Sequence, residues 1–157
     1  MKEIEYNEIT KEQFEKIDEK DVMFITNPGR MGDEDGSYFI VKNGNAFNLY
    51  RVSGWMYPDD KTEITLDDFS KKFPLWMDMW KNSSLKKNEK YTYVYMGFGN
   101  GLSVDNSIYD EFQPYLLEKV KEIKDSYHDT GDNPSFYYPA WEPAFIKMCY
   151  DKKYIIN

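Results

Sequence analysis

Three glycines at alternate positions, Gly97, Gly99 and Gly101, are the pattern in this chain that comes nearest to a nucleotide-binding loop. A dinucleotide loop places its third glycine three residues after the second, and here that position is Leu102. A phosphate-binding loop requires a Lys followed by Ser or Thr, and no such pair follows the glycines. The spacing therefore predicts a tight turn between two strands rather than a phosphate site.

A run of acidic residues, Asp33 to Asp35, precedes Gly36 and resembles the first part of a calcium-binding loop. Such a loop places a glycine at its sixth position and a bidentate acid at its twelfth. Counted from Asp33, those positions are Tyr38 and Gly44, so the match fails. We predict a solvated turn here, and weak cation binding at the same acids is the alternative that the pattern leaves open.

The single histidine and the single cysteine leave little room for acid–base, thiol or metal chemistry. His128 lies among the acids Asp125, Asp129 and Asp132, an arrangement that can orient a general base, but no nucleophile stands beside it. Cys149 lies within an apolar stretch, which predicts a buried and unreactive thiol. We therefore expect no catalytic residue, no metal site and no cofactor.

Large aromatic residues and acids occur together in two segments that we predict to be loops. Exposed rings can anchor a protein interface, and acids around them can contact Lys or Arg side chains of a partner. The alternative is that the rings fold back and cap the core, with one polar edge in water. The residues that we predict to bind a partner are Trp55, Tyr57, Asp59 and Asp60 in the first segment, and Asp129, Asp132, Tyr137, Tyr138 and Trp141 in the second.

Net charge narrows the choice of partner. The chain has 28 acidic residues against 20 Lys and Arg, which gives a formal charge of −8, and only Arg30 and Arg51 are arginines. Nucleic-acid and phosphate sites favour the guanidinium fork and a basic field, so we expect no direct contact with nucleic acid. A basic protein partner suits an acidic chain because opposite charges accelerate encounter, although an acidic composition also serves solubility alone.

The length of 157 residues fits one domain, residues 1–157, with a core that needs no disulfide. The sequence contains no internal repeat, no low-complexity tract and no run of about 18 apolar residues that would span a membrane. The first ten residues alternate charged and apolar side chains and lack an apolar export segment. We therefore expect a cytoplasmic protein with no membrane contact.

Local patterns predict the elements of an α+β fold. Asn43-Gly44-Asn45 between two β-rich runs is a strong hairpin signal, and Thr10 with Gln13 forms a capping box for a helix. We expect Thr65 to cap a second helix, and Pro74 to interrupt that helix or to open another. The expected strands are 4–6, 22–25, 38–41, 46–52, 91–96, 102–104 and 154–156; the longest helix is 108–125, and a last helix is 144–150.

Short connections between these strands favour a mostly antiparallel sheet of about four to six strands, with two to four helices packed on it, all on one side. Pro114 falls within the longest helix and is expected to kink it or to mark a junction. Trp76, Met77 and Trp80 repeat at helical spacing, which is typical of a core face. The segment 128–143 contains three prolines and is predicted to be a loop.

Two segments resemble the small immunity proteins of bacterial toxin–immunity systems: Tyr93-Val94-Tyr95-Met96-Gly97-Phe98-Gly99-Asn100-Gly101-Leu102, and Ile108-Tyr109-Asp110-Glu111-Phe112. The resemblance is at the level of the class, and it carries over no functional residue. It implies a bacterial, cytoplasmic, non-catalytic inhibitor that blocks a basic toxin domain, such as a nuclease, through an acidic and aromatic-rich surface. The alternative is a ligand- or carbohydrate-binding module lined by aromatic rings.

Overall fold

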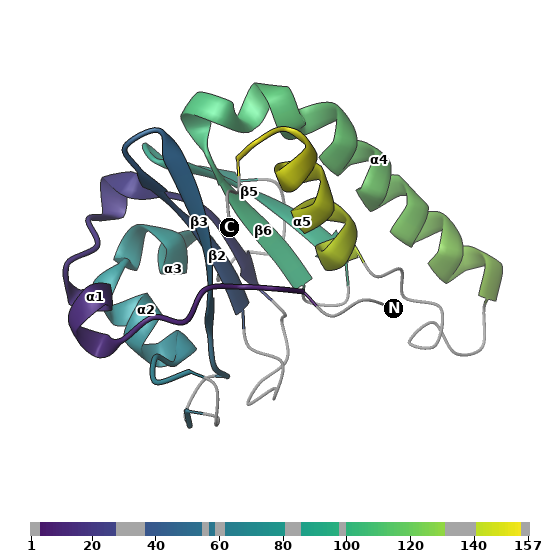
Figure 1. The fold of residues 1–157 in the computed structure, drawn as a ribbon. Coiled ribbons are helices and arrows are strands. Elements are labelled where there is room, and N and C mark those ends of the chain that lie inside the picture. Colours follow the sequence, from purple (N-terminus) through teal and green to yellow (C-terminus); the bar gives the residue numbers. More distant parts are fainter. Residues whose placement is uncertain are drawn as a thin grey trace.

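A six-stranded antiparallel sheet forms the centre of the molecule (Figure 1). The computed structural model describes residues 4–27, 37–54, 57–58, 62–80, 86–97, 100–130 and 141–154. The strand order is β3-β2-β1-β6-β5-β4, so β1 and β6 pair near the middle of the sheet. The strands are β1 Val22–Asn27, β2 Ser37–Asn43, β3 Ala46–Val52, β4 Lys86–Lys87, β5 Tyr91–Gly97 and β6 Asn100–Asp105. The predicted α+β class is confirmed.

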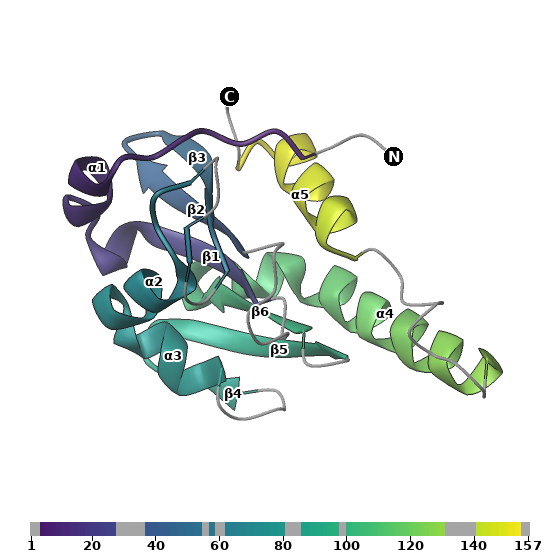
Figure 2. The same ribbon diagram turned by 90° about the horizontal axis from the view of Figure 1, so that it is seen from below.

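Helices cover both faces of this sheet (Figure 2), and the prediction that they lie on one side is wrong. Three helices contribute to one core cluster through Phe14, Phe69 and Trp76, and the other two contribute to a second cluster through Phe112 and Phe145. The helices of the first face are α1 Lys11–Glu15, α2 Leu66–Lys72 and α3 Pro74–Trp80; those of the second face are α4 Asn106–Thr130 and α5 Trp141–Asp151; a short 3-10 helix, η1, spans Glu19–Asp21.

Strand β1 shows why the sheet needs cover on both sides. Val22 and Ile25 belong to the core under α1–α3, whereas Met23 and Phe24 belong to the core under α4 and α5. An irregularity in the register between Val22 and Phe24 places two successive side chains on one face. A strand that is apolar on both faces must be buried on both.

The local helix signals on the first face are confirmed. The Thr10 hydroxyl accepts from Gln13 N at 3.1 Å, and the Gln13 side chain accepts from Thr10 N at 3.0 Å. Thr65 forms the same reciprocal box with Asp68 at the start of α2. Pro74 opens a separate helix, α3, where its missing N–H removes no helical hydrogen bond.

The two predicted hairpins are also present. Gly44, between β2 and β3, has a φ of +63°, a conformation that glycine adopts without strain. The glycine-rich segment joins β5 to β6, as predicted for a turn between strands. Gly101 is required for another reason, because a Cβ there would lie 2.2 Å from the Tyr93 hydroxyl oxygen across the strand pair.

The segment predicted as strand 4–6 makes only an isolated bridge, in which Asn7 pairs in parallel with Tyr50 of β3. A second parallel bridge joins Ser53 to Thr65. Arg51 lies between the two bridged residues Tyr50 and Ser53, and its carbonyl accepts a hydrogen bond from the Thr62 hydroxyl at 3.0 Å. Flanking segments therefore occupy much of the outer edge of β3, which protects it from pairing with another chain.

The C-terminal third contains more helix than predicted. Helix α4 continues through Pro114 to Thr130, so the proline marks no junction. The Asp110 carbonyl loses the N–H partner that residue 114 would normally supply, but Pro114 and Asp110 are both exposed, so water can satisfy this carbonyl. Helix α5 begins at Trp141, with Pro143 in its first turn. His128–Thr130 and Trp141–Pro143 are therefore helical, which corrects the predicted loop at both ends.

Tyr154, predicted to lie in a final strand, instead follows a turn after α5. Its ring packs against Phe24, Phe47 and Phe112 at centroid distances of 6.3, 5.2 and 5.2 Å. Residues 155–156 of that predicted strand lie outside the described residues. Among the helices that are described, including the long α4, none is apolar enough over a sufficient length to span a membrane.

Candidate functional site

The structure describes only part of the predicted partner-binding set. Tyr57 is 78% exposed, the highest value among the large hydrophobic residues described. Asp129 lies near the C-terminal end of α4 and Trp141 is the first residue of α5, but their side chains lie outside the description. The same holds for His128. The remaining predicted residues, Trp55, Asp59, Asp60, Asp132, Tyr137 and Tyr138, and the acids Asp33 to Asp35, lie outside the described ranges.

Tyr57 and Asp129, one described residue from each predicted cluster, belong to different parts of the fold. Tyr57 belongs to the connection between β3 and α2, whereas Asp129 is at the far end of α4. Figures 1 and 2 both show the start of α2 and the C-terminal end of α4 far apart.

A different surface combines aromatic and acidic side chains, and the sequence analysis missed it. Residues 4–9, which we call the strap, cross the outer edge of β3 and reach α5 (Figure 1). Asn7 N donates to Leu49 O at 2.8 Å, and the Tyr150 hydroxyl donates to Glu5 O at 3.3 Å. The strap thus brings the N-terminal segment, β3 and the last helix together.

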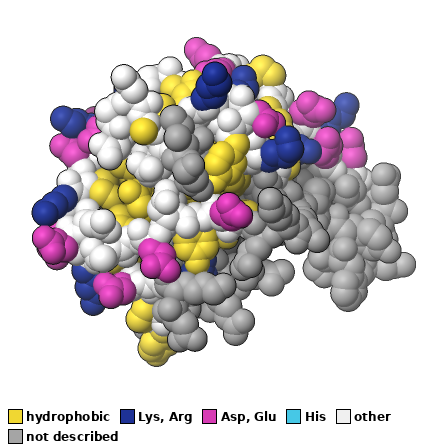
Figure 3. Space-filling view, viewed as in Figure 1, with side chains coloured by type: hydrophobic (Ala, Val, Ile, Leu, Met, Phe, Trp, Pro, Cys, Tyr) yellow, Lys and Arg dark blue, Asp and Glu magenta, His cyan; other side chains and the backbone are white. Residues whose placement is uncertain are grey.

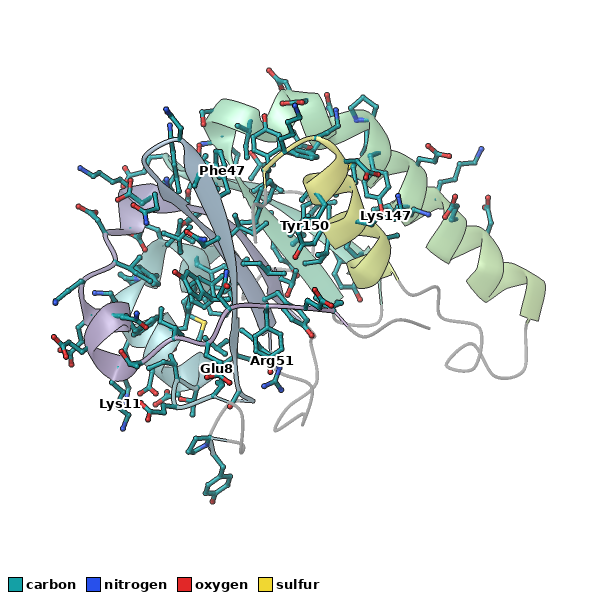
Figure 4. The ribbon with its side chains drawn as sticks, viewed as in Figure 1. Glu8, Lys11, Phe47, Arg51, Lys147 and Tyr150 are labelled. Atoms are coloured by element: carbon teal, nitrogen blue, oxygen red, sulfur yellow. The ribbon has the colours of Figure 1, made fainter. Side chains whose placement is uncertain are left out.

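Aromatic side chains line the strap on the face that carries α5. The Tyr6 ring packs edge-on against Tyr38 at 6.0 Å, and the Arg51 guanidinium lies 6.0 Å from the centre of the same ring. Phe47 and Tyr150 are half-buried beside it. Figure 4 shows Glu8, Phe47, Arg51 and Tyr150 on the side that faces the viewer, with Lys11 near Glu8 and Lys147 near Tyr150. We call the set Glu5, Tyr6, Glu8, Phe47 and Tyr150 the strap surface; Arg51, which is 7% exposed, is buried beside Tyr6.

Acidic residues are concentrated in the same part of the chain. The range 4–21 holds seven acids and three lysines, which is half of the net charge of −8 in 18 residues. Glu5 and Glu8 are exposed, and neither carboxylate takes part in an ion pair with a described residue. The strap surface therefore offers carboxylates that are available to an external cation.

Seven other acids of the described residues are paired with lysines, whereas Glu15, Glu63 and Glu118, like Glu5 and Glu8, are in no ion pair with a described residue. Exposed pairs include Glu12–Lys16 at 3.3 Å, Asp67–Lys71 at 2.9 Å and Asp151–Lys147 at 2.9 Å. On the face shown in Figure 3, acidic and basic side chains alternate, and its coloured residues form no single negative patch. Residues 4–21 carry half of the net negative charge, and the rest of the chain carries the other half.

A second group of charges is buried at the junction of η1, α3, β5 and β6. Lys90 Nζ contacts Asp105 Oδ2, donates to Lys20 O at 2.6 Å and lies 5.5 Å from the Tyr91 ring centre. Asp105 Oδ1 accepts from Ser107 N and Oγ at 2.9 and 2.6 Å. Burial alone would raise the pKa of Asp105, but the hydrogen bonds from Lys90 and Ser107 outweigh it and hold this pKa below its ordinary value.

Glu19 completes this group, which we call the ionic cluster: Glu19, Lys90, Tyr91 and Asp105. Burial raises the pKa of Glu19 and, more strongly, that of Tyr91. One ammonium therefore faces two carboxylates in a site largely closed to water. Within the described part of the chain, no three His, Cys, Asp or Glu side chains are grouped so as to hold a metal ion.

The cysteine thiol has the environment that the sequence predicts. Cys149 is fully buried in the core under α4 and α5, and burial raises its pKa far above the ordinary value. A thiol that does not ionise is a poor nucleophile, so Cys149 is a core residue.

Comparison with known proteins assigns this chain to no family. The chain matches no protein-family model, no curated protein and no solved structure. The resemblance to immunity proteins therefore rests on the residues of the glycine-rich turn and of α4 quoted above.

Proposed function

We propose that this chain is a non-catalytic binding protein, an immunity protein or inhibitor that neutralises a basic toxin domain, possessing an acidic, aromatic-rich docking surface. The observation that carries the proposal is the strap surface, where Tyr6 and Tyr150 are half-buried beside the unpaired carboxylates of Glu5 and Glu8. Tyrosine is enriched in protein interfaces, and Tyr6 and Tyr150 are each partly exposed here. Arg51 is only 7% exposed, so its guanidinium, 6.0 Å from the Tyr6 ring centre, supports that ring from within the fold. The location proposed for the protein is the cytoplasm of a bacterium.

Electrostatics gives the strap surface its preference for a basic partner. Unpaired carboxylates attract Lys and Arg over a distance of roughly 8–10 Å at physiological salt, which accelerates encounter. The nearby pair Glu12–Lys16 is exposed, with side chains 81% and 75% accessible, so its lysine can move aside at little cost. The half-buried rings then supply apolar contact area that the partner's side chains can cover.

The experiment measures binding of the purified chain to the protein encoded by the neighbouring gene, at several salt concentrations. Replacing both Glu5 and Glu8 with Gln should weaken binding about tenfold at low salt, because two attractive charges are lost. The matched control replaces the exposed acids Glu118 and Asp125 of α4 with Gln and Asn, and it should bind as tightly as the wild type. Absence of binding at low salt, or equal weakening by both variants, contradicts the proposal.

The second candidate function, a ligand- or carbohydrate-binding module, is favoured by the exposure of Tyr57. A ring that is 78% exposed can stack on a sugar. Titration with a panel of oligosaccharides, monitored by chemical shifts, separates the two functions. Binding that is lost in Tyr57→Ala but retained in the Glu5 and Glu8 variant would favour the module.

A further inference from the structure

The dipeptide Asn-Gly occurs twice in the chain, at Asn43-Gly44 and at Asn100-Gly101. In this dipeptide the asparagine side chain can react with the main chain, because glycine has no Cβ to shield the nitrogen that follows the asparagine. The reaction also needs a peptide group that can rotate and a site that is open to water. By sequence the two pairs are equivalent, and their surroundings in the fold distinguish them.

Asn43-Gly44 lies at the exposed end of the β2–β3 hairpin. Asn43 is the last residue of β2, and both it and Gly44 are exposed. The pair Asn43–Ala46 closes the strand ladder, and a Cβ built on Gly44 would meet nothing within 4 Å. Among the described residues, none hydrogen-bonds to the Asn43 side-chain amide or to the Gly44 N–H. The peptide group of Gly44 can therefore rotate toward the Asn43 amide in water without disturbing the core.

Gly101 has the opposite surroundings. It lies in β6, inside the sheet, where it pairs with Asn27 of β1 on one side and with Tyr95 of β5 on the other. Gly101 is buried, and a Cβ there would lie 2.2 Å from the Tyr93 hydroxyl oxygen. Rotation of its peptide group would require the neighbouring strands to separate.

The other asparagines of the described residues are less suited to this reaction. Each is followed by a residue that has a side chain. Two of them also hold their amides in hydrogen bonds: Asn88 Nδ2 donates to Leu75 O at 2.9 Å, and Asn106 Nδ2 donates to Asn88 O at 2.8 Å. Asn43 is therefore the best-placed asparagine of the described structure.

We propose that Asn43 is a site of spontaneous modification, at which its side-chain amide is converted to a carboxylate through a cyclic imide with Gly44. The Gly44 nitrogen gives its proton to solvent and attacks Asn43 Cγ. The new C–N bond forms, the Cγ–Nδ2 bond breaks, and Nδ2 takes up a proton and leaves as ammonia. Water then opens the ring at either carbonyl, so one water is consumed and one ammonia is released. The product is aspartate, or isoaspartate, in which the main chain runs through Cγ.

The modification changes the strand that carries part of the strap surface. Either product adds one negative charge to the hairpin, and isoaspartate also lengthens the main chain by one methylene group. Ala46 pairs with Asn43, and Phe47 of the strap surface pairs with Lys42. A longer main chain at Asn43 therefore disturbs the register that positions Phe47. The modification itself depends only on the hairpin and not on the proposed function.

The test is peptide mapping by mass spectrometry during incubation of the folded protein at mildly alkaline pH, which favours loss of the Gly44 proton. The peptide that contains Asn43 should gain the mass difference between an amide and an acid. The peptide that contains Asn100 should react at least about tenfold more slowly, because its reaction requires local opening of the sheet. If Asn43 stays unmodified, or if Asn100 reacts as fast in the folded protein, the proposal is overturned.

Two controls identify the fold and the residue as the cause. In concentrated urea the two peptides should react at similar rates, and a persistent preference for Asn43 there would show that the fold is not responsible. Asn43→Gln should abolish the mass gain in its peptide, since the corresponding ring would have six atoms and forms more slowly, whereas Asn100→Gln should leave that gain unchanged. A mass gain that persists in Asn43→Gln contradicts the assignment. The map of the wild-type protein decides the matter even if a variant fails to fold.

Discussion

Two lysine–carboxylate pairs in this molecule have the same chemistry and opposite surroundings. In the ionic cluster, Lys90 and Asp105 have side chains that are 15% and 9% accessible. On α1, Lys16 and Glu12 are 75% and 81% accessible. The buried pair joins the turn before β5 to the end of β6, whereas the exposed pair links two residues of one helical region. The comparison shows that burial, not charge content, separates the ions that hold the fold from those that can meet a partner.

Further hydrogen bonds surround the buried pair and add to the difference between it and the exposed pair. Beside the buried pair, Asn88 Oδ1 accepts from Lys90 N and Tyr91 N at 2.8 and 2.7 Å, and Asn88 Nδ2 donates to Leu75 O at 2.9 Å. Asn106 Nδ2 donates to Asn88 O at 2.8 Å. The buried ions thus belong to a network that ties α3, β5 and α4 together, and breaking one member exposes several others.

The largest effect is expected from Lys90→Ala. This change leaves the Asp105 carboxylate buried without its ammonium, and breaking a buried pair in this way typically costs about 3–5 kcal/mol. Urea unfolding of both proteins at neutral pH measures the loss. Adding Asp105→Asn to Lys90→Ala should recover part of the stability, because no uncompensated charge remains. A loss below about 1 kcal/mol would show that the pair is not effectively buried.

A smaller effect is expected from acid. The pKa of Asp105 is depressed in the folded state, so its stabilising effect is present above the unfolded value of about 3.9 and is lost as the pH falls through the folded pKa. Urea unfolding from pH 6 down to pH 2 should show a decline in stability below about pH 4. The decline should be shallower in Asp105→Asn, and equal slopes for the two proteins would remove Asp105 as its cause.

The two capping boxes extend the comparison to uncharged contacts. Thr65 is 7% exposed and Thr10 is exposed, yet each hydroxyl accepts from its helix at 3.1 Å. Thr65→Ala should cost about 1–2 kcal/mol and Thr10→Ala about 0.5–1 kcal/mol, because water replaces a lost cap only at the exposed site. Thermal unfolding of the two variants gives the order directly. Equal losses would mean that burial does not affect the caps.

The smallest effect is expected from Lys16→Ala. An exposed pair of this kind contributes about 0.3–0.5 kcal/mol, so the unfolding midpoint should hardly change. The same variant increases the net negative charge beside the strap and should strengthen binding to a basic partner at low salt. A stability loss as large as that of Lys90→Ala would erase the distinction between the two pairs.

Much of the fold could be predicted because its signals are local. The caps at Thr10 and Thr65, the start of α3 at Pro74 and the turn at Gly44 each depend on residues within about four positions. The longest helix was predicted to end at 125 rather than at Thr130, because the segment 128–143 with its three prolines was predicted to be a loop. Pro114 lay within the predicted helix and does not end α4; water can satisfy the exposed Asp110 carbonyl that the proline leaves without a partner.

The candidate surface could not be predicted in the same way. Tyr6, Phe47 and Tyr150 are separated by about 40 and 100 residues of chain and meet only because the strap crosses β3 and reaches α5. Glu5 and Tyr6 showed the same acidic and aromatic combination as the predicted loops, and that signal could have marked the strap. Its partners on β3 and α5 carry no sequence signal that links them to it.

The sequence alone determined the antiparallel α+β class, the hairpins, the caps and the burial of Cys149, since each follows from short-range pattern or from side-chain chemistry. Tertiary structure alone decided that helices cover both faces, and which charges are buried. Lys90 donates to a carbonyl 70 residues away and contacts an acid 15 residues away. Such contacts depend on the tertiary fold, because the free energy of a buried charge is set by the groups and the solvent that surround it in space and not by its neighbours in sequence.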